Sequence, residues 1–87
     1  MTYRVQITPK ALKQIAKLDK SERLRIERFL KVTLDRDNPR AVGRALVGKP
    51  FWRYRVGDYR ILASIEDDVL VVLIVAAEHR RSVYKGR

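Results

Sequence analysis

The sequence predicts an α+β domain with the element order β-α-α-β-β-β, in which an N-terminal helix hairpin packs on a mainly antiparallel four-stranded sheet. Two helix-length amphipathic segments lie within residues 8–39, and three β-prone runs follow within residues 51–77. Short turns separate these runs, which is typical of antiparallel neighbours. The chain has 87 residues, of which 46% are hydrophobic, so a single domain over residues 1–87 is expected.

The N-terminal part of the chain predicts a strand followed by a helix. Tyr3, Val5 and Ile7 alternate with polar residues, which is the pattern of a half-buried strand. Thr8 and Pro9 then supply an N-cap and a first-turn proline, and both favour the start of a helix. The apolar face of this helix is expected to carry Leu12, Ile15, Ala16 and Leu18.

A second helix is expected to follow directly, so that the two helices form a short hairpin. Ser21 is its expected N-cap, and Asn38 followed by Pro39 is its expected end. Residues 40–50 contain two glycines and a proline, and they are predicted to form a connecting loop. Apolar residues recur at helical spacing in the second helix, at Ile26, Phe29, Leu30 and Leu34.

Three strands are expected after this loop, at residues 51–56, 59–66 and 69–77. The last of them is apolar on both faces, as in a strand that is covered on both sides. We therefore expect it at the centre of the sheet, between residues 59–66 and the N-terminal strand.

Basic side chains gather on the first hairpin of this sheet. Gly57 and Asp58 form a two-residue turn, which sets Arg55 opposite Arg60. Arg53 shares their face, because side chains alternate along a strand. Like charges in directly opposite positions destabilise a sheet, so folding alone does not explain the cluster. A solvated sheet face is the alternative interpretation.

The acidic turn at residues 66–68 leaves two registers open for the last strand. Used as a three-residue turn, it would place Arg80 on the face of Arg60 if the strand extended that far. Used as a two-residue turn, it would place His79 and Arg81 there, because a slip of one residue exchanges the two faces of a strand.

The overall charge points to a polyanionic partner. Twenty Lys and Arg residues against ten Asp and Glu residues give a net charge of +10 and an isoelectric point near 10.5. The longest apolar run, at residues 69–77, is about half the roughly 20 residues that a membrane-spanning helix needs. The first residues lack the apolar core of a signal peptide, and cysteine is absent, so a cytoplasmic protein without a membrane partner is expected.

Two motifs, taken with the element order, resemble a known family. FWRYRVGDYRIL at residues 51–62 and EHRRSVY at residues 78–84 resemble the RelE branch of the RelE/ParE superfamily, the toxins of bacterial and archaeal toxin-antitoxin pairs. The resemblance covers nearly the whole chain, including the loop DNPRAVGRALVGKP at residues 37–50. It implies a RelE-like fold and a toxin that cuts messenger RNA in the decoding site of the ribosome.

The resemblance also implies a set of site residues. The basic residues on the family's second and third strands match Arg53, Arg55 and Arg60, and its C-terminal arginine and tyrosine match Arg80 and Tyr84. Two positions that often hold lysine in the family hold arginine here, at residues 53 and 55. Because an arginine stays protonated, this replacement argues against a lysine general base.

The expected chemistry is metal-independent cleavage of RNA by its own 2′-hydroxyl. This reaction needs a base, cations around the phosphate and an acid for the leaving 5′-oxygen. Arginine suits only the second task, since its planar fork binds phosphate bidentately. Tyr84 or His79 is left for proton transfer, and the family match favours Tyr84, whereas a surface position is the competing interpretation of His79. One histidine and no cysteine do not build a usual zinc site, so no metal or cofactor is expected.

The implied partners are a RelB-like acidic antitoxin and the ribosome with its messenger RNA, while operator DNA would be bound only through the antitoxin complex. An acidic, partly disordered partner suits a small basic body, because such a chain can wrap a large surface. The alternative function is that of the ParE branch, whose members share the fold but poison DNA gyrase by binding it. Fold alone does not separate the two functions.

Overall fold

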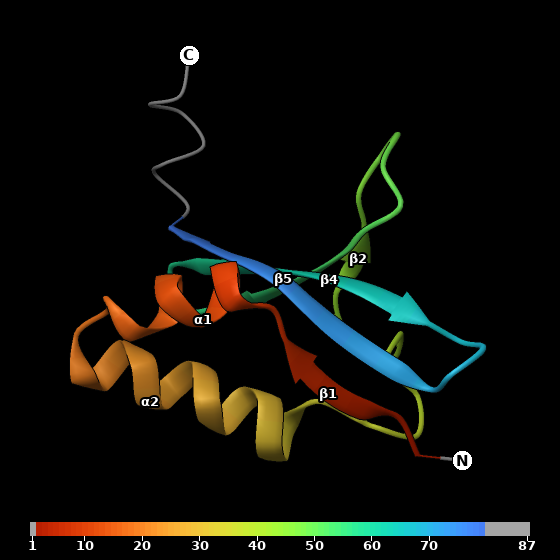
Figure 1. Ribbon diagram of the computed structural model, residues 1–87, viewed down its shortest axis with the longest axis horizontal. Coiled ribbons are helices and arrows are strands. Elements are labelled where there is room, and N and C mark those ends of the chain that lie inside the picture. The colour runs from red at the N-terminus through yellow and green to blue at the C-terminus, as the bar shows by residue number, and fades with distance from the viewer. Residues whose placement is uncertain (1, 80–87) are drawn as a thin grey trace.

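The computed structural model describes residues 2–79, and it confirms the predicted α+β class. Two helices and a π-helical turn lie on one side of a mixed sheet (Figure 1). In chain order the elements are β1 (Arg4–Ile7), α1 (Pro9–Ala16), α2 (Lys20–Arg28), the π-helical turn η1 (Phe29–Thr33), β2 (Arg44–Ala45), β3 (Trp52–Val56), β4 (Tyr59–Glu66) and β5 (Val71–His79).

The sheet has five strands in the order β1-β5-β4-β3-β2, with β1 parallel to β5 and all other neighbours antiparallel. The prediction of β5 at the centre, between β1 and β4, is confirmed. The predicted number of four strands is wrong, because part of the expected loop pairs with β3 as a short fifth strand, β2. A strand of two residues is too short to show the alternation by which strands are recognised in a sequence.

Helix α1 starts as predicted but turns a different face to the sheet. The Thr8 hydroxyl oxygen accepts a hydrogen bond from the N–H of Ala11 at 3.2 Å, which confirms the N-cap. Ala11 and Ile15 are the buried pair, one helical turn apart, while Leu12 is 56% exposed. The predicted apolar face was therefore wrong at Leu12 and at Ala16, which is exposed, and correct at Ile15.

Helix α2 begins earlier and ends sooner than predicted. Asp19 occupies the N-cap position and Ser21 lies inside the helix, so the predicted cap is wrong. The α-helical hydrogen bonding stops at Arg28 and passes into the π-helical turn, which ends before Asn38 and Pro39. No helix within residues 2–79 is long and apolar enough to cross a membrane.

The core lies between these helices and one face of the sheet. Ile26, Leu30 and Leu34 are buried there as predicted, against alternate residues of β3, β4 and β5. Tyr54 is fully buried, and its hydroxyl donates a hydrogen bond to the Pro39 carbonyl at 2.5 Å. Burial raises the pKa of Tyr54 to about 12, which keeps this donor protonated.

The register of β5 on β4 follows neither predicted turn. The turn spans four residues, 67–70, and Leu70 adopts the left-handed region with a φ of 53°. Next to the turn, a four-residue connection directs the side chains of β5 to the same faces of the sheet as a two-residue turn would. The pairing then shifts by one residue between Leu62 and Ala63, where Val75 is the extra residue of a β-bulge. Beyond the bulge, the side chains of β5 therefore point to the faces that the three-residue turn predicted, and Arg60 lies opposite Glu78.

Helix α1 supports β5 where β1 ends. The last pair of the parallel ladder joins Ile7 to Ile74, and the Thr8 N–H continues it with a bond to the Ile74 carbonyl at 2.9 Å. Beyond the bulge, the Gln14 side-chain oxygen accepts the Ala77 N–H at 2.8 Å. A helix side chain thus replaces a strand along the edge that leads to Glu78.

Candidate active site

The predicted arginine cluster is present on the sheet face that carries no helix. Arg55 lies directly opposite Arg60 across β3 and β4, and Arg53 precedes Arg55 by two residues on the same face. Gly57 has a φ of 58°, which suits the two-residue turn between the strands. The hairpin therefore places two guanidinium groups in one cross-strand pair and a third beside them.

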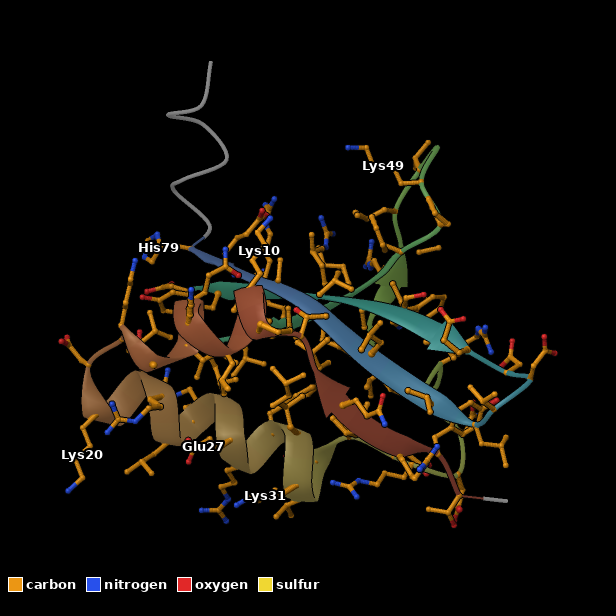
Figure 2. The ribbon with its side chains drawn as sticks, viewed as in Figure 1. Lys10, Lys20, Glu27, Lys31, Lys49 and His79 are labelled. Carbon is orange, nitrogen blue, oxygen red and sulfur yellow. The ribbon has the colours of Figure 1, made fainter. Side chains whose placement is uncertain are left out.

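A fourth arginine, which sequence reasoning missed, extends the cluster onto β2. Arg44 lies directly opposite Arg53, so its side chain shares the same face. A hydrogen bond from the Leu46 N–H to the Phe51 carbonyl at 3.0 Å closes the hairpin of β2 and β3. This β2–β3 hairpin projects from the body of the sheet, with Lys49 near its tip (Figure 2). The glycines and the proline of residues 40–50 indicate a loop, so the sequence did not predict this short strand.

One carboxylate, also missed from the sequence, faces the same cluster. Glu78 on β5 lies directly opposite Arg60, so that Arg55, Arg60 and Glu78 form one row across three strands. The sequence left the facing of Glu78 open, because it depends on the turn and the bulge described above. Its side chain is half-buried.

The four arginines lack ion pairs in the part of the chain that the structure describes. Within residues 2–79, ion pairs of 4.0 Å or less join Arg25 to Glu22 and Arg40 to Asp67 only. Repulsion in the two cross-strand arginine pairs is therefore not offset by salt bridges there. Such an arrangement favours a bound anion, because an anion would relieve the repulsion.

A cleft of about 510 Å³ lies beside the arginines, along the edge of β3. It forms because β2 pairs only with Trp52 and Arg53 and leaves the rest of β3 uncovered. Gly43 lines it with a φ of 85°, and a Cβ on this residue would lie 2.5 Å from the Arg53 carbonyl oxygen, so the close approach requires glycine. The residues that line the cleft include Arg44, Arg53, Arg55 and Arg60, together with Phe29, Tyr54 and Tyr59.

The aromatic residues near the cleft belong mainly to the core. Tyr54 is buried, and Trp52 and Tyr59 pack against the same core. The Trp52 indole N–H donates to the Val42 carbonyl at 2.7 Å, and Phe29 tilts against Tyr54 with ring centres 5.4 Å apart. These contacts position the walls of the cleft, and the charged residues that line it are the four arginines and Asp58.

The structure does not bring His79 to the arginine face. His79 lies at the end of β5 (Figure 2). It is directly opposite Tyr59, and the two rings meet edge to face with centres 5.0 Å apart. Tyr59 points to the helix side of the sheet, where burial and then the carboxylates of Glu22 and Asp19 raise its pKa. The other two predicted site residues, at positions 80 and 84, lie outside the described residues.

Another arginine, Arg40, lies at the opposite end of the sheet and, unlike the arginines of the cluster, forms an ion pair. Arg40 donates two hydrogen bonds to the Asp67 carboxylate, each at 3.0 Å, and the Tyr3 hydroxyl donates a third at 2.6 Å. The bonds from Arg40 and then Tyr3 lower the pKa of Asp67 to about 2. This network ties three distant segments of the chain together.

The arginine face is chemically suited to bind and polarise a phosphate. Guanidinium groups donate in a fixed fork and accept no proton, so the arginines supply charge stabilisation and leave acid–base work to other groups. Within residues 2–79, no three His, Cys, Asp or Glu side chains come together in a way that would hold a metal ion.

These features define a class: small, strongly basic α+β domains with a cation-rich open sheet face. The family model described as "ParE toxin of type II toxin-antitoxin system, parDE" matches residues 5–84, which is nearly the whole chain. The chain therefore belongs to this family of type II toxins, within the RelE/ParE superfamily.

Solved structures of RelE toxins are similar to the chain. A chain of the toxin-antitoxin complex RelBE2 from Mycobacterium tuberculosis is 29% identical with a TM-score of 0.82, and the match covers 92% of this chain and 93% of that one. A chain of the RelE-RelB complex from Pyrococcus horikoshii is 28% identical with a TM-score of 0.71, covering 92% and 97%.

A more distant structure shows the same fold. The toxin RelE of E. coli, solved as a double mutant in the free state, is 24% identical with a TM-score of 0.78, and the match covers 98% of this chain and 93% of that one. These matches confirm the expected RelE-like fold. No curated protein sequence matches the chain closely enough to count as a relative.

Proposed function

We propose that this toxin is a ribosome-dependent endoribonuclease that cleaves messenger RNA without a metal ion. The observation that carries the proposal is the open-face cluster of Arg44, Arg53, Arg55 and Arg60, which lacks ion pairs within residues 2–79. Like-charge pairs of this kind weaken a sheet, so a role in binding a polyanion is the simplest reason for them.

In the proposed reaction the 2′-oxygen of the RNA attacks the adjacent phosphorus and the bond to the 5′-oxygen breaks. Arg53, Arg55 and Arg60, together with Arg80, hold the phosphate and stabilise the charge that develops on its oxygens. Tyr84, which the family match favours for proton transfer, protonates the leaving 5′-oxygen. His79 ranks behind it, because its ring lies on the other side of the sheet from Arg60.

The ribosome completes the site in this proposal. The arginine cluster supplies charge but little control over the angle between the 2′-oxygen and the leaving oxygen, and holding reactants in line accounts for a large share of many rate enhancements. We therefore expect slow cleavage of naked RNA and fast cleavage of messenger RNA on ribosomes, in the cytoplasm.

The test is toe-printing of messenger RNA on purified ribosomes, with and without the toxin, in buffer containing a chelator that spares ribosomal magnesium. New cleavage ends that need both toxin and ribosome are the expected result. Equally fast cutting of the same RNA without ribosomes would contradict the ribosome requirement, and no cutting in either case would contradict the nuclease assignment.

We further propose a RelB-like acidic antitoxin as the partner that restrains the toxin, with operator DNA bound only through the pair. The similar structures from M. tuberculosis and P. horikoshii are both complexes of a toxin with its antitoxin, and the charge of +10 suits an acidic partner. Expression of the toxin alone is expected to arrest growth, and co-expression of the acidic protein encoded beside it is expected to restore growth and to co-purify.

A second candidate function is the poisoning of DNA gyrase, and the description of the matching family as ParE favours it. That function needs a protein-binding surface but no nuclease residues. The two candidates separate in one experiment: gyrase-linked DNA breaks with intact messenger RNA would select the second candidate, whereas cleaved messenger RNA with normal supercoiling would select the first.

A further inference from the structure

The arginine cluster leaves one chemical task without a residue. Attack by a 2′-hydroxyl requires a group that takes its proton, and a guanidinium cannot do so. His79 faces the other side of the sheet. Among the described residues, two carboxylates lie near the arginines. Asp58 lines the cleft but belongs to the β3–β4 turn, whereas Glu78 lies in the same cross-strand row as Arg55 and Arg60.

The fold holds Glu78 in this row by two local devices. The bulge at Val75 turns the face of β5 so that Glu78, rather than its neighbour, lies opposite Arg60. The Gln14 side-chain oxygen then accepts the Ala77 N–H at 2.8 Å and secures the strand one residue before Glu78. The position of this carboxylate is therefore supported from the helix layer.

We infer that Glu78 is the general base of the reaction, an inference that rests on the proposed nuclease function. The Glu78 carboxylate takes the proton of the 2′-hydroxyl as the 2′-oxygen forms its bond to phosphorus. The bond from phosphorus to the 5′-oxygen breaks, and the 5′-oxygen receives a proton from the general acid of the proposed function. The products are a 2′,3′-cyclic phosphate and a 5′-hydroxyl, so atoms and charge balance without a further reactant.

A purely electrostatic role, in which Glu78 only offsets the repulsion between Arg55 and Arg60, is the competing explanation. Within residues 2–79, no ion pair of 4.0 Å or less engages the Glu78 carboxylate, although Arg60 is its direct cross-strand neighbour. A carboxylate that is held near the phosphate-binding cations but not locked in a salt bridge retains the lone pairs that a base needs.

The experiment compares Glu78→Gln with the parent toxin in single-turnover cleavage of messenger RNA on ribosomes. The variant keeps the shape of the side chain and removes its basicity, so a rate loss of about 100-fold or more is expected, the range for general base catalysis. Glu66→Gln is the matched control, because Glu66 lies on the same face of β4 at the end far from the arginines. It is expected to cleave at the parent rate.

Glu78→Ala then separates a base from a compensating charge. Added formate is expected to restore part of the rate, whereas chloride at the same ionic strength is not, because both are anions but only formate accepts a proton readily. Rescue by both anions alike, or a parent rate for Glu78→Gln, would overturn the inference. Circular dichroism melting of each variant excludes loss of folding, and a parent toxin that cuts nothing would instead refute the proposed function.

Discussion

Two groups of arginines on this molecule show opposite arrangements. Arg40 is held by Asp67 in a two-point salt bridge, with the Tyr3 hydroxyl on the same carboxylate. On the open face, Arg55 is set against Arg60 by the β3–β4 hairpin and makes no ion pair within residues 2–79.

The difference separates a cation that is paired within the fold from the cations that we propose for the site. The Arg40 network joins the N-terminal segment, the loop after η1 and the β4–β5 turn, so Arg40 already donates two hydrogen bonds within the folded chain. The open-face arginines make no ion pair within residues 2–79, and their like-charge pairs weaken the sheet. Pairing, rather than exposure, therefore distinguishes the two groups.

Among the variants of the two arginine groups, the largest expected effect is the loss of cleavage by Arg60→Ala. Removal of one cation that stabilises the transition state is expected to lower the single-turnover rate on ribosomes by at least about tenfold. Arg40→Ala is the control, and it is expected to cleave at the parent rate, because its guanidinium is bound to Asp67. Equal losses in the two variants would erase the distinction between the two groups of arginines.

Arg55→Thr is expected to make the protein more stable while making it less active. Threonine favours a strand, and the substitution removes the like-charge pair with Arg60, so the free energy of unfolding is expected to rise by about 0.2–1 kcal/mol. Urea denaturation measures the change, and the cleavage assay measures the accompanying loss. A less stable variant would show that Arg55 supports the fold.

A change in the Arg40–Asp67 pair is expected to lower stability and to leave the cleavage rate unchanged. Asp67→Asn removes the carboxylate that receives Arg40 and Tyr3, so the thermal midpoint is expected to fall slightly while the cleavage rate is retained. Because the ion pair is exposed, the difference from the parent should shrink in high salt. Ser64→Ala serves as the control, because it removes a hydrogen bond to a different carboxylate, that of Glu66 on β4.

The smallest expected effect is the pH dependence of that same network. The pKa of Asp67 is about 2 in the folded state against an ordinary value of 3.8. The contribution of Asp67 to folding stability is therefore fully present above pH 3.8 and is lost as the pH falls towards about 2. The stability difference between the parent and Asp67→Asn should therefore be constant near neutral pH and narrow in acid. Denaturation curves from pH 7 to pH 3 test this, and a gap that widens in acid would contradict the assignment.

The arginine hairpin was predictable because its geometry is local. Gly57 and Asp58 define a two-residue turn, and such a turn determines which residues of the flanking strands face each other. Arg53, Arg55 and Arg60 could therefore be placed on one face from a stretch of eight residues. The N-cap at residue 8 was predictable for the same reason.

Other features depended on contacts that no local pattern reveals. The fifth strand contains only Arg44 and Ala45, and it exists because β3 offers an edge for pairing. The α-helical part of α2 ends at a π-helical turn, which Leu34 closes by donating its N–H to the Phe29 carbonyl at 2.8 Å. Neither feature has a sequence signal as strong as a turn glycine or a helix cap.

By itself, the sequence determined the charge excess, the α+β class, the central position of β5 and the arginine pair of the hairpin, because composition, periodicity and short turns specify each of them. Only the tertiary structure decided which face of β5 carries Glu78 and which carries His79. That choice depends on a four-residue turn and a bulge beside Val75, in a strand whose edge is shared by β1 and the Gln14 side chain of α1. A shift of one residue exchanges the two faces, and packing against the rest of the chain selects between them.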